Sequence, residues 1–357
     1  AAEVIAADKM MRAGKFKSGK YTIEAPKSRL ASGSDLAELK AKANAPGVLQ
    51  GDPRDFVTGL DGKPTIVAEP LAGQTLDEQL KAAVTTTKSV GTDGKNKNTY
   101  TRNDDAVSAI KKLVSSSAPI KAVAKATGTD VAMGNGDRFL GQFAPENFLF
   151  DAKTKRFSYV DNTAKDAKGS LVSKSDASGG FANARANFNS WATWSYVDKL
   201  VTDLDSLASR LVEMYTGLDA TGGQGQIGMG IIAPFLTGGS VGRADNDKNA
   251  VARELMAIIT DKYPSMLAAA TAGLKMGRET VLKQLSDPLA LTAGLPQDSR
   301  LEAVTSLLAR RAMLKGAGSA DAAWDAANVQ AHKLLKLKFK PAVPAYDSQR
   351  MAQSVPN

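Results

Sequence analysis

The 357-residue chain has no cysteine and only one histidine, His332. Disulfides, thiolate metal sites and cysteine nucleophiles are therefore excluded. A zinc site built from several histidines is excluded as well, and no nucleophile-elbow pattern supports a Ser-His-Asp triad that uses His332. The chemistry that remains rests on carboxylates, amides, hydroxyls, lysine, arginine and a hard metal such as Mg²⁺.

Long apolar runs are also missing from the sequence. No run approaches the ~20 residues that a membrane-spanning helix needs, so we expect a soluble protein. Residues 1–17 lack the apolar core of a secretory signal. Because the sequence begins with alanine, it does not tell whether an export signal precedes it.

Aromatic residues make up only 6% of the chain, whereas the net charge is +9. A basic surface attracts nucleic acid, anionic lipid, acidic protein and nucleotides. No basic stripe is interleaved with aromatic residues, so specific nucleic-acid binding is not expected. Anionic lipid stays a candidate partner, for example of "KLLKLKFK" (333–340), although a solvated amphipathic end is the simpler interpretation.

Patterns in the first half of the chain predict strands mixed with helices. Residues 14–30 alternate like one or two strands with a glycine turn, and 55–73 resemble a hairpin. Helices are expected at 34–44 and from Thr75, where Thr75 and Glu78 match a capping box over "TLDEQLKAAVTTT". A loop is expected at 88–105 because this stretch is rich in Gly, Asn and Asp.

From residue 105 onward the patterns are mainly helical, apart from one hairpin. Helical spacing returns at 105–128, and "NFLFDAKTKRFSYVDN" (147–162) predicts two strands around a turn. After about residue 189, helical patterns cover 191–215, 248–263, 265–285 and 300–314. This order predicts an α+β, two-lobed protein: a strand-rich N-lobe at 1–72, a mainly helical C-lobe at 73–310 and a C-terminal helix and tail at 311–357.

The segment 133–162, "MGNGDRFLGQFAPENFLFDAKTKRFSYVDN", concentrates the candidate chemistry. In order it holds "GDR", then "ENFLFD", then a strand ending in "FSYVD". Together with the strand "TIEAPK", the helix "DLAELK" and the hinge-like "IVAEPLAG", these parts resemble the protein-kinase-like fold over roughly residues 15–215. The "GDR" form resembles the catalytic loops of phosphatidylinositol kinases and atypical bacterial effector kinases.

The resemblance implies a role for each polar residue. Asp137 would orient the acceptor hydroxyl and take its proton, and Arg138 would neutralise phosphate or order the loop. Asn147 and Asp161 would bind Mg²⁺ on the phosphates of ATP. On the nucleotide side, Lys27 would hold phosphates, Glu38 would pair with Lys27, and the backbone from Glu69 to Leu71 would meet the adenine edge.

Several features depart from that family pattern. Asp137 and Asn147 are ten residues apart instead of five, so the insertion "LGQFA" must bulge or turn. "DNT" replaces Asp-Phe-Gly, and no Ala-Pro-Glu follows it. No glycine-rich phosphate loop is visible; either "GKFKSG" (14–19) is a degenerate form or the N-lobe is truncated at its start.

From the resemblance we expect an ATP- and Mg²⁺-dependent kinase that phosphorylates a protein hydroxyl, as a secreted bacterial effector with a host substrate would. Three alternatives remain open: a phosphoinositide or small-molecule kinase, an adenylyl- or glutamyl-transferase on the same fold, and a non-catalytic pseudokinase scaffold.

Overall fold

The computed structural model shows an α+β protein, which confirms the predicted class, and most of its ordered elements are helices. The structure describes residues 16–25, 27–30, 66–68, 71, 73–92, 94–136, 138–140, 144–159, 180–225, 229–236, 246–293, 295 and 297–338, together with 9, 12, 34 and 37. Within this part, no helix is both long and apolar enough to cross a membrane.

A five-stranded sheet carries the predicted central hairpin. Its strands are β1 (Lys17–Ser18), β2 (Tyr21–Glu24), β5 (Gln74–Thr75), β8 (Phe148–Asp151) and β9 (Arg156–Tyr159), and their order across the sheet is β1-β2-β9-β8-β5. Strands β2 and β9 pair in parallel, and the other neighbours are antiparallel. The sheet thus joins strands from both predicted lobes, and the strand pairs expected within 14–30 and 147–162 are confirmed.

A second, two-stranded sheet pairs β3 (Ser28–Leu30) with β4 (Ile66–Ala68). The rest of the hairpin predicted at 55–73 is described only at 71 and 73, and the helix predicted at 34–44 only at 34 and 37.

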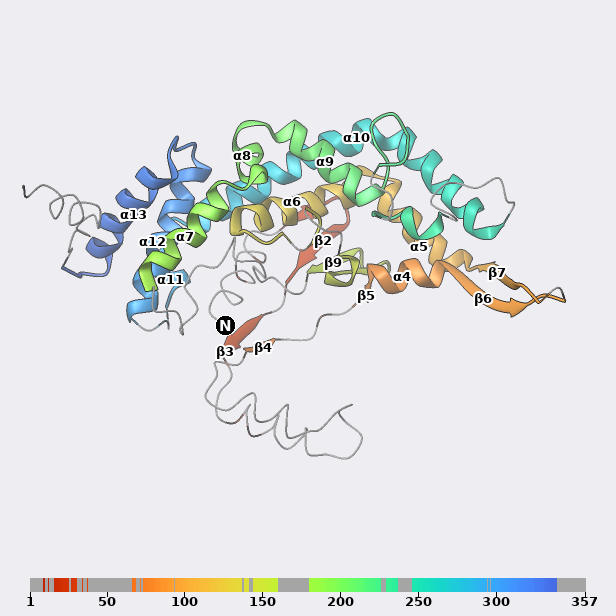
Figure 1. The fold of residues 1–357 in the computed structure, drawn as a ribbon, viewed down its shortest axis with the longest axis horizontal. Coiled ribbons are helices and arrows are strands. Elements are labelled where there is room, and N and C mark those ends of the chain that lie inside the picture. Colours follow the sequence, from red (N-terminus) through yellow and green to blue (C-terminus); the bar gives the residue numbers. More distant parts are fainter. Residues whose placement is uncertain are drawn as a thin grey trace, which may run out of the picture.

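The capping box at Thr75 is confirmed, but the helix is shorter than predicted. Glu78 N donates to Thr75 Oγ1 at 3.1 Å, and Thr75 N donates to Glu78 Oε2 at 2.9 Å. Helix α4 (Leu76–Ala83) then ends, and the chain continues as β6 (Val84–Val90) and β7 (Asn96–Arg102). The loop predicted at 88–105 is therefore wrong, because most of it is an antiparallel ribbon that extends away from the helices (Figure 1). Both faces of this ribbon are exposed along most of its length, so it carries no apolar alternation from which strands are predicted.

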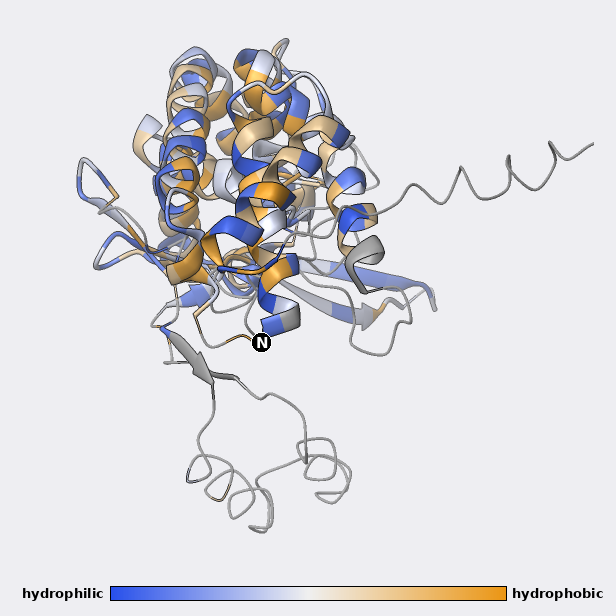
Figure 2. Ribbon diagram, turned by 90° about the vertical axis from the view of Figure 1, so that its left-hand side faces the viewer, coloured by the Kyte–Doolittle hydropathy of each residue, from blue (hydrophilic) through white to orange (hydrophobic). Residues whose placement is uncertain are grey.

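The remaining helices form the body of the molecule. They are α5 (Asp104–Val114), α6 (Ser117–Met133), α7 (Gly180–Ala192), α8 (Ser195–Thr202), α9 (Leu204–Thr216), α10 (Asp247–Gln284), α11 (Pro288–Leu291), α12 (Gln297–Leu314) and α13 (Ala320–Leu334), with short 3-10 helices at Pro145–Asn147 and Ala233–Phe235. Figure 2 shows hydrophobic and hydrophilic residues alternating around these helices, as expected for amphipathic elements.

Two helical predictions need correction in their boundaries. The stretch 191–215 is divided among α7, α8 and α9. The stretches 248–263 and 265–285 form one 38-residue helix, α10, which contains Pro264. Helix α10 packs along α6, and glycines at the contact let the two backbones approach closely.

Candidate functional site

The candidate catalytic loop begins where α6 ends. Gly134 ends this helix with φ 82°, a left-handed conformation that glycine adopts without steric cost, and Asn135 N donates to Asp130 O at 2.8 Å. Asp137 lies outside the described residues. Its neighbours Gly136 and Arg138 are both described, so the chain is placed on each side of Asp137.

A backbone hydrogen bond closes the long spacer between "GDR" and Asn147. Ala144 N donates to Arg138 O at 3.0 Å, and Asn147 N then donates to Ala144 O at 3.1 Å within a short 3-10 helix. Ala144 thus lies against Arg138, so the chain returns on itself between these two residues, as the predicted turn requires. Asn147 is half-buried immediately before β8.

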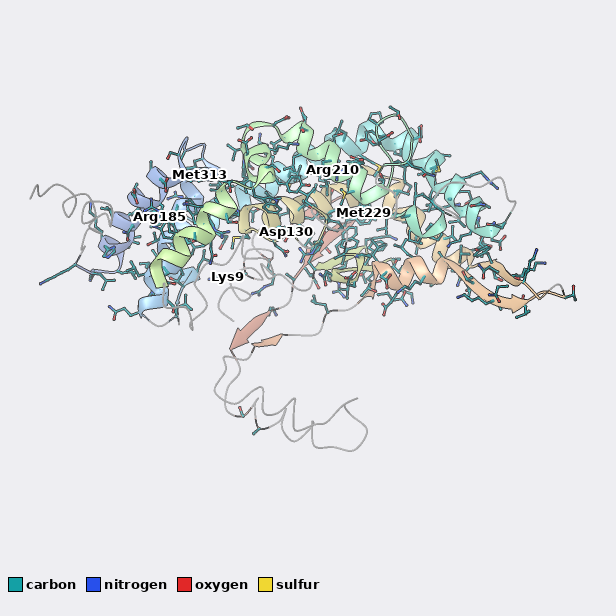
Figure 3. All side chains as sticks on the ribbon, viewed as in Figure 1. Lys9, Asp130, Arg185, Arg210, Met229 and Met313 are labelled. Atoms are coloured by element: carbon teal, nitrogen blue, oxygen red, sulfur yellow. The ribbon has the colours of Figure 1, made fainter. Side chains whose placement is uncertain are left out.

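Arg138 is buried and paired with a carboxylate that the sequence analysis missed. Its Nη1 donates to Asp130 Oδ1 and Oδ2 at 2.9 and 2.8 Å, and its guanidinium lies 4.9 Å from the centre of the Tyr159 ring. Asp130 lies on α6 in the middle of the helical body (Figure 3). Of the two roles expected for Arg138, this arrangement favours ordering the loop over contacting phosphate.

Burial and charge act in opposite directions on this pair. Burial raises the pKa of Asp130 to about 6, although the Arg138 guanidinium favours the ionised carboxylate. A signal for Asp130 is present in the sequence: in the stretch "AVAKATGTDVAM" it is the one acidic residue, and apart from Lys125 its neighbours there are apolar or small.

Aromatic contacts bring the loop and both strands of the hairpin together. The Phe139 ring lies 5.5 Å from Phe148, and Phe148 lies 5.4 Å from Tyr159, its partner in the sheet register. With Arg138 on Tyr159, the start of β8 and the end of β9 meet the loop at one end of the hairpin.

This convergence concerns the neighbours of the predicted base and of the two predicted metal ligands. Asp137 directly precedes Arg138, Asn147 directly precedes Phe148, and Asp161 follows Tyr159 by two residues. Asp161, like Asp137, lies outside the described residues. The flanking residues of the three candidates therefore meet in one region. In the sequence the candidates themselves lie up to 24 positions apart, from Asp137 to Asp161.

The end of α6 is held by two more residues that sequence patterns did not single out for this role. Trp191 Nε1 donates to Val131 O at 2.9 Å, and Arg310 Nη1 donates to Met133 O at 2.7 Å. The Arg310 guanidinium also lies 4.8 Å from the Trp191 ring centre. Arg310 supplies a donor for one of the carbonyls that a helix leaves unpaired at its C-terminus, and it adds a favourable positive charge there. Trp191 adds a second donor to Val131 O, which also accepts from Gly134 N at 3.2 Å.

The predicted nucleotide-binding residues are only partly described. Lys27 is exposed just before β3, while Glu38 and Glu69 lie outside the described residues. The Lys27–Glu38 ion pair therefore stays a prediction. Leu71 is half-buried and precedes β5, which pairs with β8, so the hinge-like segment leads into the same sheet as the hairpin.

The predicted Mg²⁺ site also stays a prediction. Across the described residues, no group of three or more histidines, aspartates or glutamates is arranged to hold a metal. Of the two predicted ligands, Asn147 is described and Asp161 is not. Mg²⁺ in nucleotide sites is typically bound by one or two protein oxygens together with phosphates, so Asn147 and Asp161 have suitable donor chemistry.

Comparisons with protein-family models, curated proteins and solved structures found no match to this chain.

Proposed function

We propose that the protein is an ATP- and Mg²⁺-dependent phosphotransferase of atypical kinase type that acts on a protein hydroxyl. The observation that supports this proposal is the meeting of Arg138, Phe148 and Tyr159 at one end of the β8–β9 hairpin. These residues flank Asp137, Asn147 and Asp161, which supply a base and two metal ligands. Phosphoryl transfer depends mainly on positioned charge, and these residue types provide it.

The roles follow from the chemistry of the side chains. The Asp137 carboxylate would accept the proton of the acceptor hydroxyl, and Asn147 and Asp161 would hold the Mg²⁺ ion. When bound, Mg²⁺ neutralises negative charge that develops on the transferred phosphoryl group.

Rigid support of the loop is the second part of the proposal. A catalytic carboxylate must stay close to its productive position, because small displacements are costly in rate. The buried pair with Asp130 fixes Arg138, the residue directly after Asp137. Arg310 and Trp191 fix the helix that leads into the loop.

The proposed cellular setting comes from the resemblance alone: a secreted bacterial effector whose substrate is a host protein. The net charge of +9 favours encounter with acidic proteins and with nucleotides, and so is compatible with this setting.

Phosphate transfer from ATP to a panel of acidic and neutral acceptor proteins tests the proposal. Intact-mass spectrometry of the product separates phosphorylation from adenylylation and glutamylation. We expect Asp137→Ala and Asp161→Ala each to lower the rate by about 10²- to 10⁴-fold while thermal unfolding is unchanged. The matched control is Asp198→Ala, an exposed aspartate on α8. Full activity in Asp137→Ala and in Asp161→Ala, or no binding of ATP with Mg²⁺ to the parent protein, would refute the proposal.

A further inference from the structure

Three lysines from separate elements meet beside the turn of the β8–β9 hairpin. Lys20 lies in the β1–β2 turn, Lys112 in the last turn of α5, and Lys155 in the β8–β9 turn. The Tyr21 hydroxyl donates to Lys112 O at 3.3 Å, and Thr22 N donates to Lys155 O at 3.2 Å. These two bonds hold the backbones of the lysine cluster (Lys20, Lys112 and Lys155) together.

Lys155 occupies its position at an energetic cost. Its φ is 60°, in the left-handed region that favours glycine, and its Nζ donates to Ala152 O at 2.5 Å. Partial burial and the positive charges of Lys112 and Lys20 lower the pKa of Lys155, and Asp151 acts in the opposite direction. Backbone strain together with like-charge repulsion is a feature of sites that are built for binding.

The carboxylates that flank the turn have other partners. Asp151 accepts hydrogen bonds from Lys153 N, Thr154 N and Thr154 Oγ1. Glu24 on β2 pairs with Arg156 at 3.4 Å. Both carboxylates keep their charge, but five basic side chains (Lys20, Lys112, Lys153, Lys155 and Arg156) stand against these two, so the charge beside the turn is positive on balance, as an anion site requires.

A cavity of about 530 Å³ lies between α4, α5 and the β8–β9 hairpin, and its lining ends at Lys153, two residues before Lys155. Ala106 and Ala109 of α5 line it with small and apolar residues of α4 and the hairpin, and its polar lining residues are Gln74, Gln79, Asp151 and Lys153. Lys112 lies three residues after Ala109, so the two share one side of α5. The volume is within the range of small-molecule sites, and the lining is largely apolar with a lysine at its edge.

We propose that the lysine cluster and this cavity form a binding site for a phosphomonoester, with its phosphate among Lys20, Lys112 and Lys155 and its organic part in the cavity. The cavity borders Asp151, at the opposite end of β8 from Asn147. A strand of this length separates the two ends by about 10 Å, so the site is distinct from the candidate catalytic loop and does not depend on phosphoryl transfer.

Binding of inositol hexakisphosphate measured by calorimetry, and co-sedimentation with phosphatidylcholine vesicles containing phosphatidylinositol 4-phosphate, test the proposal. We expect Lys112→Gln and Lys155→Gly each to weaken binding about five-fold. Lys155→Gly is informative because glycine relieves the strained φ: the variant should fold at least as stably as the parent and still bind less well. Lys283→Gln, at an exposed position on α10, is the control.

Binding of inositol hexakisphosphate, with or without binding of the vesicles, assigns the site to a soluble phosphate ester, and binding of vesicles alone assigns it to a lipid headgroup; each of these results supports the proposal. Three results overturn it: no binding of either probe, equal loss in Lys283→Gln, or displacement of the probe by ATP with Mg²⁺, which would make the two sites one.

Discussion

Arg138 and Asp130 form an ion pair inside the protein: Nη1 of Arg138 lies 2.8 Å from Asp130 Oδ2, and the two side chains are only 1% and 7% exposed. Removing one member of such a pair leaves a buried charge without its partner. We expect Asp130→Asn to lower the free energy of unfolding by about 3–5 kcal/mol, measured by urea denaturation.

A matched control is the exposed pair of Lys81 and Asp77, whose side chains are 75% and 35% exposed. Asp77→Asn should cost less than about 1 kcal/mol because solvent screens that pair. A loss in Asp130→Asn no larger than in Asp77→Asn would show that the buried pair does not hold the loop.

Arg310 should affect the candidate loop from a distance. Its Nη1 donates to Met133 O at 2.7 Å, one residue before the helix ends. Arg310→Met keeps an apolar stem but leaves that buried carbonyl without this donor, at an expected cost of about 1–3 kcal/mol. If the protein transfers phosphate as proposed, kcat should fall while KM for ATP changes little, because Arg310 positions the loop and contacts no nucleotide. Trp191→Phe removes the bond to Val131 O and also shrinks a fully buried ring that lies against Arg310, so stability and kcat should fall in this variant too. Unchanged stability and kcat in both variants would argue against this support.

Glu254 should make the attachment of the β6–β7 ribbon sensitive to acid. Arg102, the last residue of β7, donates to both oxygens of Glu254 at 2.6 and 3.1 Å, and Lys111 lies at 2.5 Å. The hydrogen bond from Arg102 is the main cause that lowers the pKa of Glu254, to about 2 from 4.5. The folded protein thus holds this proton less tightly than the unfolded chain, so the stabilisation is complete above pH 4.5 and is lost as the pH falls towards 2.

Urea denaturation of the parent and of Glu254→Gln over this pH range measures the effect. The difference in unfolding free energy should be about 1 kcal/mol at neutral pH, since the Glu254 side chain is 37% exposed and screened by salt. It should disappear near pH 2. A difference that is the same at all pH values would mean that the Glu254 charge is not responsible.

Local signals explain which elements could be predicted from the sequence. Thr75 and Glu78 satisfy each other within one helical turn, so their pattern identifies the helix start without any tertiary contact. The β8–β9 hairpin has apolar residues on both strands around a polar turn, and it was predicted correctly. The β6–β7 ribbon has no alternation of apolar and polar residues, because neither of its faces is buried. It is held by pairing between its two strands, which a sequence pattern does not reveal.

The candidate site could be predicted only in its polar residues, not in its supports. "GDR", Asn147 and Asp161 are recognisable from their order in the chain. Arg310, by contrast, is 177 residues from the carbonyl that it contacts, and nothing local marks it as part of the site. Asp130 is closer in sequence, but its pairing with Arg138 depends on the loop folding back onto α6.

The contact between α6 and α10 should be intolerant of even one added methyl group. A Cβ at Gly277 would lie 2.3 Å from Lys125 O and 2.8 Å from Thr129 N, both backbone atoms that cannot move aside without shifting α6. Alanine favours helix over glycine by up to about 1 kcal/mol, so a purely local effect would stabilise the protein. We expect the opposite sign: Gly277→Ala should lower the free energy of unfolding by about 1–3 kcal/mol through overpacking. Gly318→Ala, where a Cβ would meet nothing within 4 Å, is the matched control and should change stability little. Because α6 leads directly into the candidate loop, a stabilised Gly277→Ala variant would contradict both the close helix contact and the rigid support that it gives to the loop.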